Sequence, residues 1–160
     1  MRIQFYLFLI LSSLFFIADQ FSKYWVKNTF YKKMFGTNIF ELGEFEINLH
    51  VAINKGVSFS MFSNDNQLPI ILLTGAIILG LVIWLKKTSQ YLTSTGLSMI
   101  LGGAIGNLID RMAIGGVVDF ISVSYDKYYF PTFNVADILI FSGVVLIFFQ
   151  DMFAKTIKKV

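Results

Sequence analysis

Long apolar stretches alternate with shorter polar segments along the 160-residue chain. A helix needs about 20 mostly apolar residues to cross the hydrocarbon core of a bilayer. Four stretches of this kind, with few or no charged side chains, run over approximately residues 5–25, 68–85, 91–109 and 134–152. The pattern predicts four transmembrane helices within a single membrane domain that comprises residues 1–160.

The first apolar stretch could instead belong to a cleaved signal peptide. Its uncharged run from Ile3 to Ala18 is long, and aromatic and polar residues follow it in place of a small-residue cleavage site. We therefore expect this stretch to be a membrane span.

Basic residues beside the spans predict the orientation of the chain. Six of them precede the first span, connect the second and third, or follow the fourth: Arg2, Lys86, Lys87, Lys155, Lys158 and Lys159. The positive-inside rule places this side, and with it both termini, in the cytoplasm. The bias is moderate, because the opposite side contains Lys27, Lys32, Lys33, Lys55 and Lys127. The segments of about 27–67 and 112–133 are then extracytoplasmic.

The two extracytoplasmic segments have different patterns. Residues 39–53 alternate polar with apolar side chains, a period typical of strands buried on one face, so they predict a small sheet resting on the membrane. Residues 112–133 contain Gly115-Gly116 and a group of Tyr and Phe rings of the type that favours a membrane interface, and we expect a hairpin-like loop there. The expected fold class is an all-α integral membrane protein to which this small sheet is added.

Composition agrees with a membrane protein and narrows the possible chemistry. Hydrophobic residues make up 56% of the chain and charged residues 14%, against roughly 25% charged residues in soluble domains. The chain has no Cys and one His, which excludes disulfides, thiol nucleophiles and the usual zinc sites. We expect no metal and no cofactor. No basic surface interleaved with aromatic residues suggests a nucleic-acid partner.

Ionisable residues at membrane depth are costly, so each of them is a functional hypothesis. Asp19 and Lys23 are four residues apart and can form an ion pair, which would either stabilise the first helix or shape a site. Catalysis by Ser22 with Lys23 as its base is disfavoured, because adjacent side chains on a helix point apart.

The third span ends in a block of small and polar residues. Gly102 and Gly106 form a small-xxx-small face that lets another helix approach closely. Asn107, Asp110 and Arg111 follow and can form one polar cluster. Such a cluster is either a self-satisfied structural network or a device that positions a catalytic group.

Two further aspartates lie near the ends of the expected external loop. Apolar residues flank Asp119, so desolvation favours its neutral form. Asn134 and Asp137 could be a capping pair at the start of the fourth span. Packed helices lie about 8–10 Å apart, so Asp119 and Asp137 can converge as a carboxylate pair that shares a proton. Such a pair could activate water without metal, thiol or serine.

Five blocks of the sequence resemble, in order, those of a known family. They are Asp19-Gln20-Phe21-Ser22-Lys23, Asn54-Lys55-Gly56-Val57-Ser58-Phe59, residues 102–111 (GGAIGNLIDR), Val117-Val118-Asp119-Phe120 and Phe133-Asn134-Val135-Ala136-Asp137. The family is lipoprotein signal peptidase, also called signal peptidase II, a bacterial membrane aspartyl protease. The resemblance covers essentially the whole chain.

The resemblance implies roles for individual residues. It implies that Asp119 and Asp137 are the catalytic pair. It also implies that eight residues line or support the site: Asp19, Lys23, Asn54, Gly56, Asn107, Arg111, Asn134 and Ala136. We add Asp110 from the third block. It also implies four transmembrane helices, a small extracytoplasmic sheet and a short surface helix.

The resemblance further implies an activity and a location. The expected protein is an endopeptidase of the bacterial cytoplasmic membrane, with its active site near the outer face. It would cleave diacylglyceryl-modified prolipoproteins just before the lipidated Cys. We expect it to act as a monomer among membrane lipids, and to be inhibited by the cyclic peptide globomycin.

Other functions predict different arrangements. In a small four-helix proton-coupled transporter, Asp19, Asp110 and Asp137 would relay protons, but relay carboxylates should be spread through the membrane depth and these are expected at the outer ends. A membrane scaffold would explain the glycine block but not the isolated Asp119. A presenilin-type protease would need a Gly-x-Gly-Asp signature, which this sequence lacks.

Overall fold

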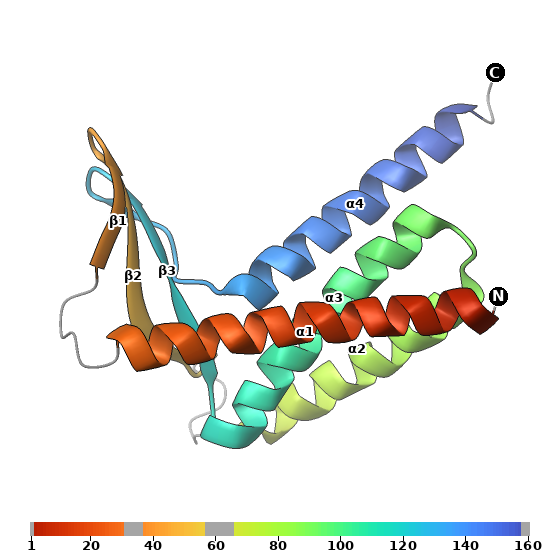
Figure 1. Cartoon of the computed structure of the whole chain (residues 1–160), viewed down its shortest axis with the longest axis horizontal. Helices are drawn as coiled ribbons and strands as arrows, with labels where there is room; N and C mark the ends of the chain where they lie inside the picture. The colour runs from red at the N-terminus through yellow and green to blue at the C-terminus, as the bar shows by residue number, and fades with distance from the viewer. Residues whose placement is uncertain (1, 31–36, 57–65, 158–160) are drawn as a thin grey trace.

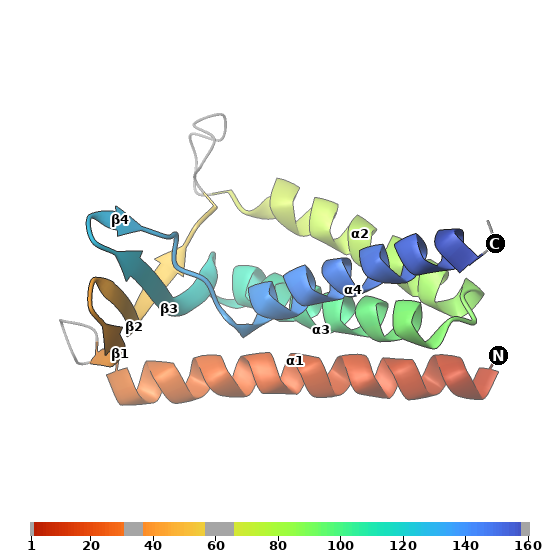
Figure 2. The same ribbon diagram turned by 90° about the horizontal axis from the view of Figure 1, so that it is seen from above.

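The computed structural model describes residues 2–30, 37–56 and 66–157, in which four long helices and one four-stranded sheet are found. The helices are α1 (Arg2–Phe30), α2 (Leu68–Lys87), α3 (Tyr91–Ile114) and α4 (Val135–Ile157). The strands are β1 (Thr37–Leu42), β2 (Phe45–Asn54), β3 (Val117–Tyr125) and β4 (Tyr128–Tyr129). In both views the sheet lies at one end of the helices and the two chain termini at the other (Figures 1 and 2).

Each of the four predicted spans coincides with a helix that is long and apolar enough to cross a membrane. Their ends differ from the prediction. Helix α1 continues to Phe30, and α3 continues past Asp110 and Arg111 to Ile114. The charged pair was expected to mark the end of the span, yet α3 continues through it. Lys23 of α1 pairs with Asp110, and Nη1 of Arg111 donates to a backbone carbonyl one turn earlier. Gly115, with a left-handed φ of 70°, ends α3.

Glycines on α3 let two other helices approach it closely. A Cβ at Gly102 would lie 2.6 Å from the Cβ of Phe15 on α1, and a Cβ at Gly106 would collide with the Asp19 carboxylate. On another face of α3, a Cβ at Gly103 would lie 2.5 Å from a backbone carbonyl oxygen of α4. The small-xxx-small prediction is therefore confirmed, and α3 is the central helix of the bundle.

The sheet is antiparallel with the order β1-β2-β3-β4. Its first hairpin, with Gly43 at a φ of 61° in the turn, confirms the strands predicted in residues 39–53. Strand β3 lies in the segment that was expected to be a loop, so that expectation is wrong. The expected small sheet is present with four strands, and the all-α label is not confirmed. Residues 117–120 are all buried, and all of them except Asp119 are apolar. This half of β3 therefore lacks the alternation of apolar and polar residues that marks a half-buried strand.

Two sequence predictions fall partly outside the described residues. No short surface helix occurs in ranges 2–30, 37–56 and 66–157. Lys32, Lys33, Lys158, Lys159 and the Val57-Ser58-Phe59 part of the second block lie outside these ranges.

An apolar cluster joins the sheet to the bundle. Phe120 of β3 packs against Val26 and Phe30 near the end of α1. Opposite Phe120 a β-bulge shifts the register, since Leu49 pairs with Ile121 and the next pair is Ala52 with Asp119. Successive side chains of a strand point to opposite faces, so burying Phe120 against α1 directs the Asp119 side chain away from that cluster.

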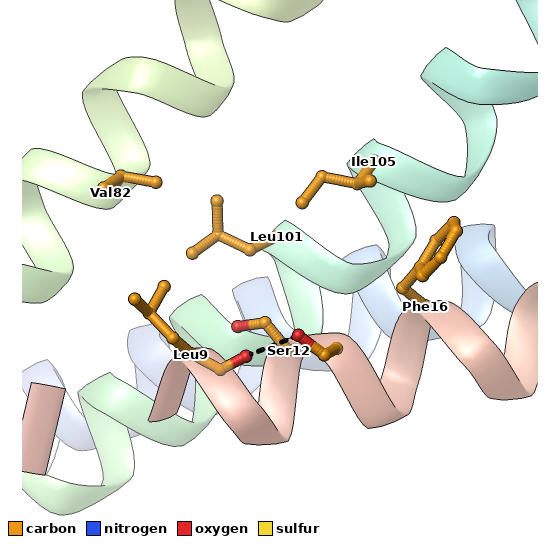
Figure 3. Close-up of a pocket in the computed structure, with 7 residues that line it drawn as sticks. Leu9, Ser12, Phe16, Val82, Leu101 and Ile105 are labelled. Atoms are coloured by element: carbon orange, nitrogen blue, oxygen red, sulfur yellow. Dashed lines mark hydrogen bonds between the residues drawn. The ribbon is translucent and has the colours of Figure 1, made fainter. Parts of the chain in front are cut away.

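An apolar cavity of about 300 Å³ lies where α1, α2 and α3 meet (Figure 3). It is lined by Leu9, Ser12, Ser13, Phe16, Val82, Leu101 and Ile105. The hydroxyls of Ser12 and Ser13 already donate to backbone carbonyls one turn earlier. The cavity contains no ionisable side chain, so we place the candidate chemistry elsewhere.

Candidate active site

The polar residues predicted from the sequence meet where the sheet joins the helices. Asp119 comes from β3, Asp137 from the first turn of α4, Asn107 from α3 and Asn54 from the end of β2. Asn134, directly before α4, connects them. Segments distant in the sequence thus supply one hydrogen-bonded network.

Asn134 contacts both candidate aspartates. Its Nδ2 donates to Oδ1 of Asp119 at 2.7 Å and to Oδ1 of Asn107 at 3.2 Å. Its Oδ1 accepts from the backbone N–H of Asp137 at 3.0 Å, and its own N–H donates to Oδ2 of Asp137 at 3.2 Å. The predicted capping pair therefore forms. Capping and a role in the site are compatible, since different atoms of the same side chain serve them.

Asp119 is almost fully enclosed, with 1% of its surface exposed. Besides the bond from Asn134, its Oδ2 accepts from Nδ2 of Asn54 at 2.8 Å. The Asn54 amide is oriented by Gly56, whose N–H donates to its Oδ1 at 2.9 Å. Burial raises the pKa of Asp119 and the nearby charge of Asp137 adds to the rise, while the Asn54 and Asn134 amides oppose it. This direction agrees with the sequence expectation.

Asp137 is half-buried and receives one donor on each carboxylate oxygen. Its Oδ1 accepts from Nδ2 of Asn107 at 2.9 Å, and its Oδ2 accepts from the backbone of Asn134. Asn107 in turn accepts on Oδ1 from Nζ of Lys23 at 2.8 Å. An ammonium can only donate, so Lys23 turns the amide oxygen of Asn107 toward itself and the amide nitrogen toward Asp137.

Lys23 lies between two buried carboxylates. Its Nζ is 2.8 Å from Oδ2 of Asp19 and 2.9 Å from Oδ2 of Asp110. The predicted pair of Asp19 and Lys23 is confirmed. Oγ of Ser22 donates to the Asp19 carbonyl at 2.6 Å, so the hydroxyl of Ser22 is directed at the backbone and not at Lys23.

Gln20 is a site residue that the sequence analysis missed. Its Nε2 lies within hydrogen-bond distance of Oδ2 of Asp19, at 3.2 Å, and of Oδ1 of Asp110, at 3.1 Å. Its place directly after Asp19 in the first sequence block was the available signal. Without knowledge of how α1 faces α3, that position did not distinguish it from a lipid-facing residue.

Arg111 lies near the aspartates but binds differently from the prediction. Its Nη1 donates to the backbone carbonyl of Asn107 at 3.2 Å, and its charge interacts with Asp137, Asp119 and Asp110. Because Asp110 pairs with Lys23, the predicted cluster of Asn107, Asp110 and Arg111 forms only in part. Nε of Arg111 is buried and has no hydrogen-bond partner among the described residues.

The arrangement suits acid–base chemistry. Two carboxylates on different elements are held by amide donors in a largely enclosed setting, as proton transfer to and from a reacting group requires. In the described ranges no three His, Cys, Asp or Glu side chains are grouped so that they could hold a metal ion.

A sequence profile described as Signal peptidase (SPase) II matches residues 11–153, which include every candidate residue above. The chain belongs to the signal peptidase II family. The resemblance inferred from the five sequence blocks is thereby confirmed, and membership makes the protein a protease. Its four apolar helices fit a multi-pass bacterial membrane protein.

Similar proteins support the assignment to signal peptidase II. A lipoprotein signal peptidase of Bartonella quintana (strain Toulouse) is 40% identical over 138 residues, which cover 84% of this chain and 79% of the relative. One of Dichelobacter nodosus (strain VCS1703A) is 34% identical over 151 residues, covering 91% and 93%. A solved structure described as a bacterial membrane enzyme aligns with a TM-score of 0.75 and 28% identity over 94% of this chain and 90% of that one. The similarity therefore extends over nearly the full length of the fold.

Proposed function

We propose that this signal peptidase II removes signal peptides from diacylglyceryl-modified prolipoproteins by cleaving just before the lipidated Cys. One observation carries the proposal. Two carboxylates, Asp119 and Asp137, are joined through Asn134 at one end of a four-helix membrane bundle in a member of this family. The relatives named lipoprotein signal peptidase support the choice of substrate.

The proposed orientation puts the sheet and the aspartates at the outer face of the bacterial cytoplasmic membrane. Lys86 and Lys87 end α2 at the opposite end of the bundle, and both termini lie there as well (Figure 1). The positive-inside rule assigns that end to the cytoplasm. A diacylglyceryl anchor would hold the scissile bond at the outer interface, so the carboxylates would meet the bond while its lipid stays in the bilayer.

In the proposed mechanism Asp137 is the general base and Asp119 the general acid. Asp137 takes a proton from water as the water oxygen bonds to the peptide carbonyl carbon. The C–N bond then breaks while Asp119 gives its proton to the leaving nitrogen. Asp119 is assigned the acid role because burial raises its pKa, which favours its protonated form. The proton on Asp137 then passes to Asp119, directly or by exchange with solvent, and resets the pair.

Arg111 and Asn54 are proposed to bind the substrate. Nε of Arg111 is a buried donor without a partner in the described residues, and a substrate carbonyl would satisfy it. Asn54 is exposed at the edge of the site and could exchange its bond to Asp119 for one to substrate. Gly56, with a φ of 72°, forms the adjacent turn. We further propose that globomycin competes for this site and that the enzyme acts as a monomer.

The test uses Asp119→Asn and Asp137→Asn in purified enzyme with a lipidated precursor. Loss of a general acid or base typically lowers the rate by about 10²–10⁴-fold, and we expect kcat to fall by about that factor in either variant. Asp126→Asn is the matched control. Asp126 is exposed in the β3–β4 turn, and its φ of 52° is one that Asn adopts readily, so this variant should cleave normally.

Two results would contradict the proposal. Near-normal cleavage by folded Asp119→Asn or Asp137→Asn would remove that residue from catalysis. Equal cleavage of lipidated and unlipidated precursors would refute the proposed substrate class. The alternative of a proton relay is less well supported, because Asp19, Asp110 and Asp137 belong to one network at the sheet end and are not spread along the helices.

A further inference from the structure

We infer that Asp19, Lys23 and Asp110, called here the buried triad, form a positioning device that fixes the separation of Asp119 and Asp137. The inference rests on the proposed function for the identity of the catalytic pair. Its geometry is independent of that proposal, since it concerns how two backbone segments are held.

Each carboxylate of the buried triad binds the backbone directly before one catalytic aspartate. Oδ1 of Asp19 accepts from the N–H of Ala136, the residue before Asp137, at 2.9 Å. Oδ2 of Asp110 accepts from the N–H of Val118, the residue before Asp119, at 3.2 Å.

One ammonium joins the two carboxylates. Nζ of Lys23 is 2.8 Å from Asp19 and 2.9 Å from Asp110. The start of α4 and the start of β3 are therefore tied to the same cation, although no hydrogen bond between Asp119 and Asp137 themselves is found.

The donors of Lys23 are fully used. Its three N–H groups match three acceptors, the carboxylates of Asp19 and Asp110 and Oδ1 of Asn107. The third bond adds a side-chain route to Asp137, because it orients the amide that donates to that carboxylate. Lys23 has no donor left for substrate, so it acts through its neighbours.

Burial indicates a role in geometry more than in stability. The side chains of Lys23 and Asp19 are 4% and 0% exposed, and that of Asp110 is 8% exposed. Desolvation cancels much of the attraction in a buried ion pair, and apolar residues of similar volume often stabilise a protein as well or better. Placing an acid and a base on opposite sides of a scissile bond demands closer control, since errors of about 1 Å can cost 10²-fold in rate.

The absence of Cys from the chain allows a direct test of separation. In an Asp119→Cys, Asp137→Cys double variant, the rate at which a short bifunctional maleimide links the two new thiols reports their spacing without any need for proteolysis. Adding Asp110→Leu removes the acceptor for Val118 and should slow cross-linking about tenfold. Adding Asp110→Asn keeps an oxygen acceptor and should slow it less than about threefold. Asp151→Leu, an exposed position on α4, is the control and should have no effect.

Kinetics in the otherwise unchanged enzyme give the second readout. Asp110→Leu should lower kcat about 10²-fold with KM nearly unchanged, and Asp110→Asn should recover most of the loss. If Asp110→Leu does not fold, Gln20→Leu is the variant that tests the inference. It removes the amide beside the carboxylates of Asp19 and Asp110 and leaves their ion pairs with Lys23 in place. We expect Gln20→Leu to slow cross-linking about threefold.

An unchanged cross-linking rate in folded Asp110→Leu would overturn the positioning role. If Asp110→Leu does not fold, an unchanged rate in Gln20→Leu would overturn it. Retained activity in Asp119→Asn would instead overturn the proposed function and leave the cross-linking result valid. The two proposals can therefore fail separately.

Discussion

Gly96 on α3 and Gly143 on α4 face each other where the two helices cross. A Cβ on Gly96 would lie 2.7 Å from the carbonyl oxygen of Gly143, and a Cβ on Gly143 would lie 2.5 Å from that of Gly96. A second contact, between Gly103 and Ala136, lies seven residues later on α3 and seven residues earlier on α4, as expected for antiparallel helices. The first turn of α4, which holds Asp137, is thus placed by backbone contact with α3.

Replacing Gly96 with Leu should destabilise the protein by about 1–3 kcal/mol, because the new side chain would press on the α4 backbone. A Cβ at Gly80 on α2 would meet nothing within 4 Å, so Gly80→Leu is the matched control and should be near neutral. Thermal unfolding followed by tryptophan fluorescence in detergent measures both. Equal melting temperatures for the two variants would show that the helix crossing tolerates side chains.

Substitutions at Asn134 should distinguish its role as the N-cap of α4 from its role in holding the site together. Asn134→Ser keeps a good N-cap for α4 but loses the amide donors to Asp119 and Asn107, so we expect near-normal stability with a large loss of kcat. Asn134→Ala loses both functions and should cost roughly 1–2 kcal/mol as well. Parallel melting and cleavage assays test this. Full activity in Asn134→Ser would mean that capping alone matters.

The turn after β2 should matter for activity more than for stability. Gly56 and Gly43 both have left-handed φ values, 72° and 61°, so Ala at either position should cost about 1 kcal/mol. Only Gly56 binds Asn54, and only its Cβ would press on a side chain, at 3.3 Å from Cδ1 of Ile70. Gly56→Ala should therefore reduce cleavage while Gly43→Ala does not. Similar cleavage rates would exclude a role for this turn.

Acidification should stabilise the wild-type protein relative to Asp119→Asn. Burial raises the pKa of Asp119 in the folded state, so the folded protein binds this proton more tightly than the unfolded chain. The contribution is fully present below the unfolded pKa and is lost as the pH rises through the folded one. When the pH is lowered from about 7 to about 4, the melting temperature of the wild type should rise by a few degrees relative to that of Asp119→Asn. A constant difference would contradict the raised pKa.

The proposed orientation can be tested in the same Cys-free background. Ser89 lies in the connection between α2 and α3, and Lys127 lies in the β3–β4 turn, and both are exposed. A membrane-impermeant maleimide added to spheroplasts should label Lys127→Cys and should label Ser89→Cys only after lysis. The reverse pattern would place the sheet in the cytoplasm.

Local pattern was enough to predict the four apolar helices, the strands of the first hairpin and the ion pair of Asp19 with Lys23. Each of these depends on residues close in sequence, where hydrophobic period and spacing are informative. The candidate pair of Asp119 and Asp137 followed from their flanking residues and from the helix connection, and the family blocks supported it. Its catalytic role stays a prediction.

Long-range register could not be predicted from the sequence. Residues 117–120 gave no period-two signal, and the alternation in residues 121–125 (ISVSY) was overlooked, so β3 was read as a loop. The bonds from Val118 to Asp110 and from Ala136 to Asp19 involve backbone donors, which no side-chain pattern reveals. The role of Gln20 was missed for the same reason, since it depends on which faces of α1 and α3 meet.

The central position of α3 has a consequence for how the chain enters the membrane. Its most apolar window has a mean hydropathy of 1.4 against 2.6 for α2, and 61% of that window is buried against 6% for α2. A span with this composition partitions into lipid less favourably by itself than its neighbour does. The short connection from Lys87 to Tyr91 links the two, so the strongly lipophilic α2 can assist the insertion of the helix that brings Asn107 and Asp110 to the site.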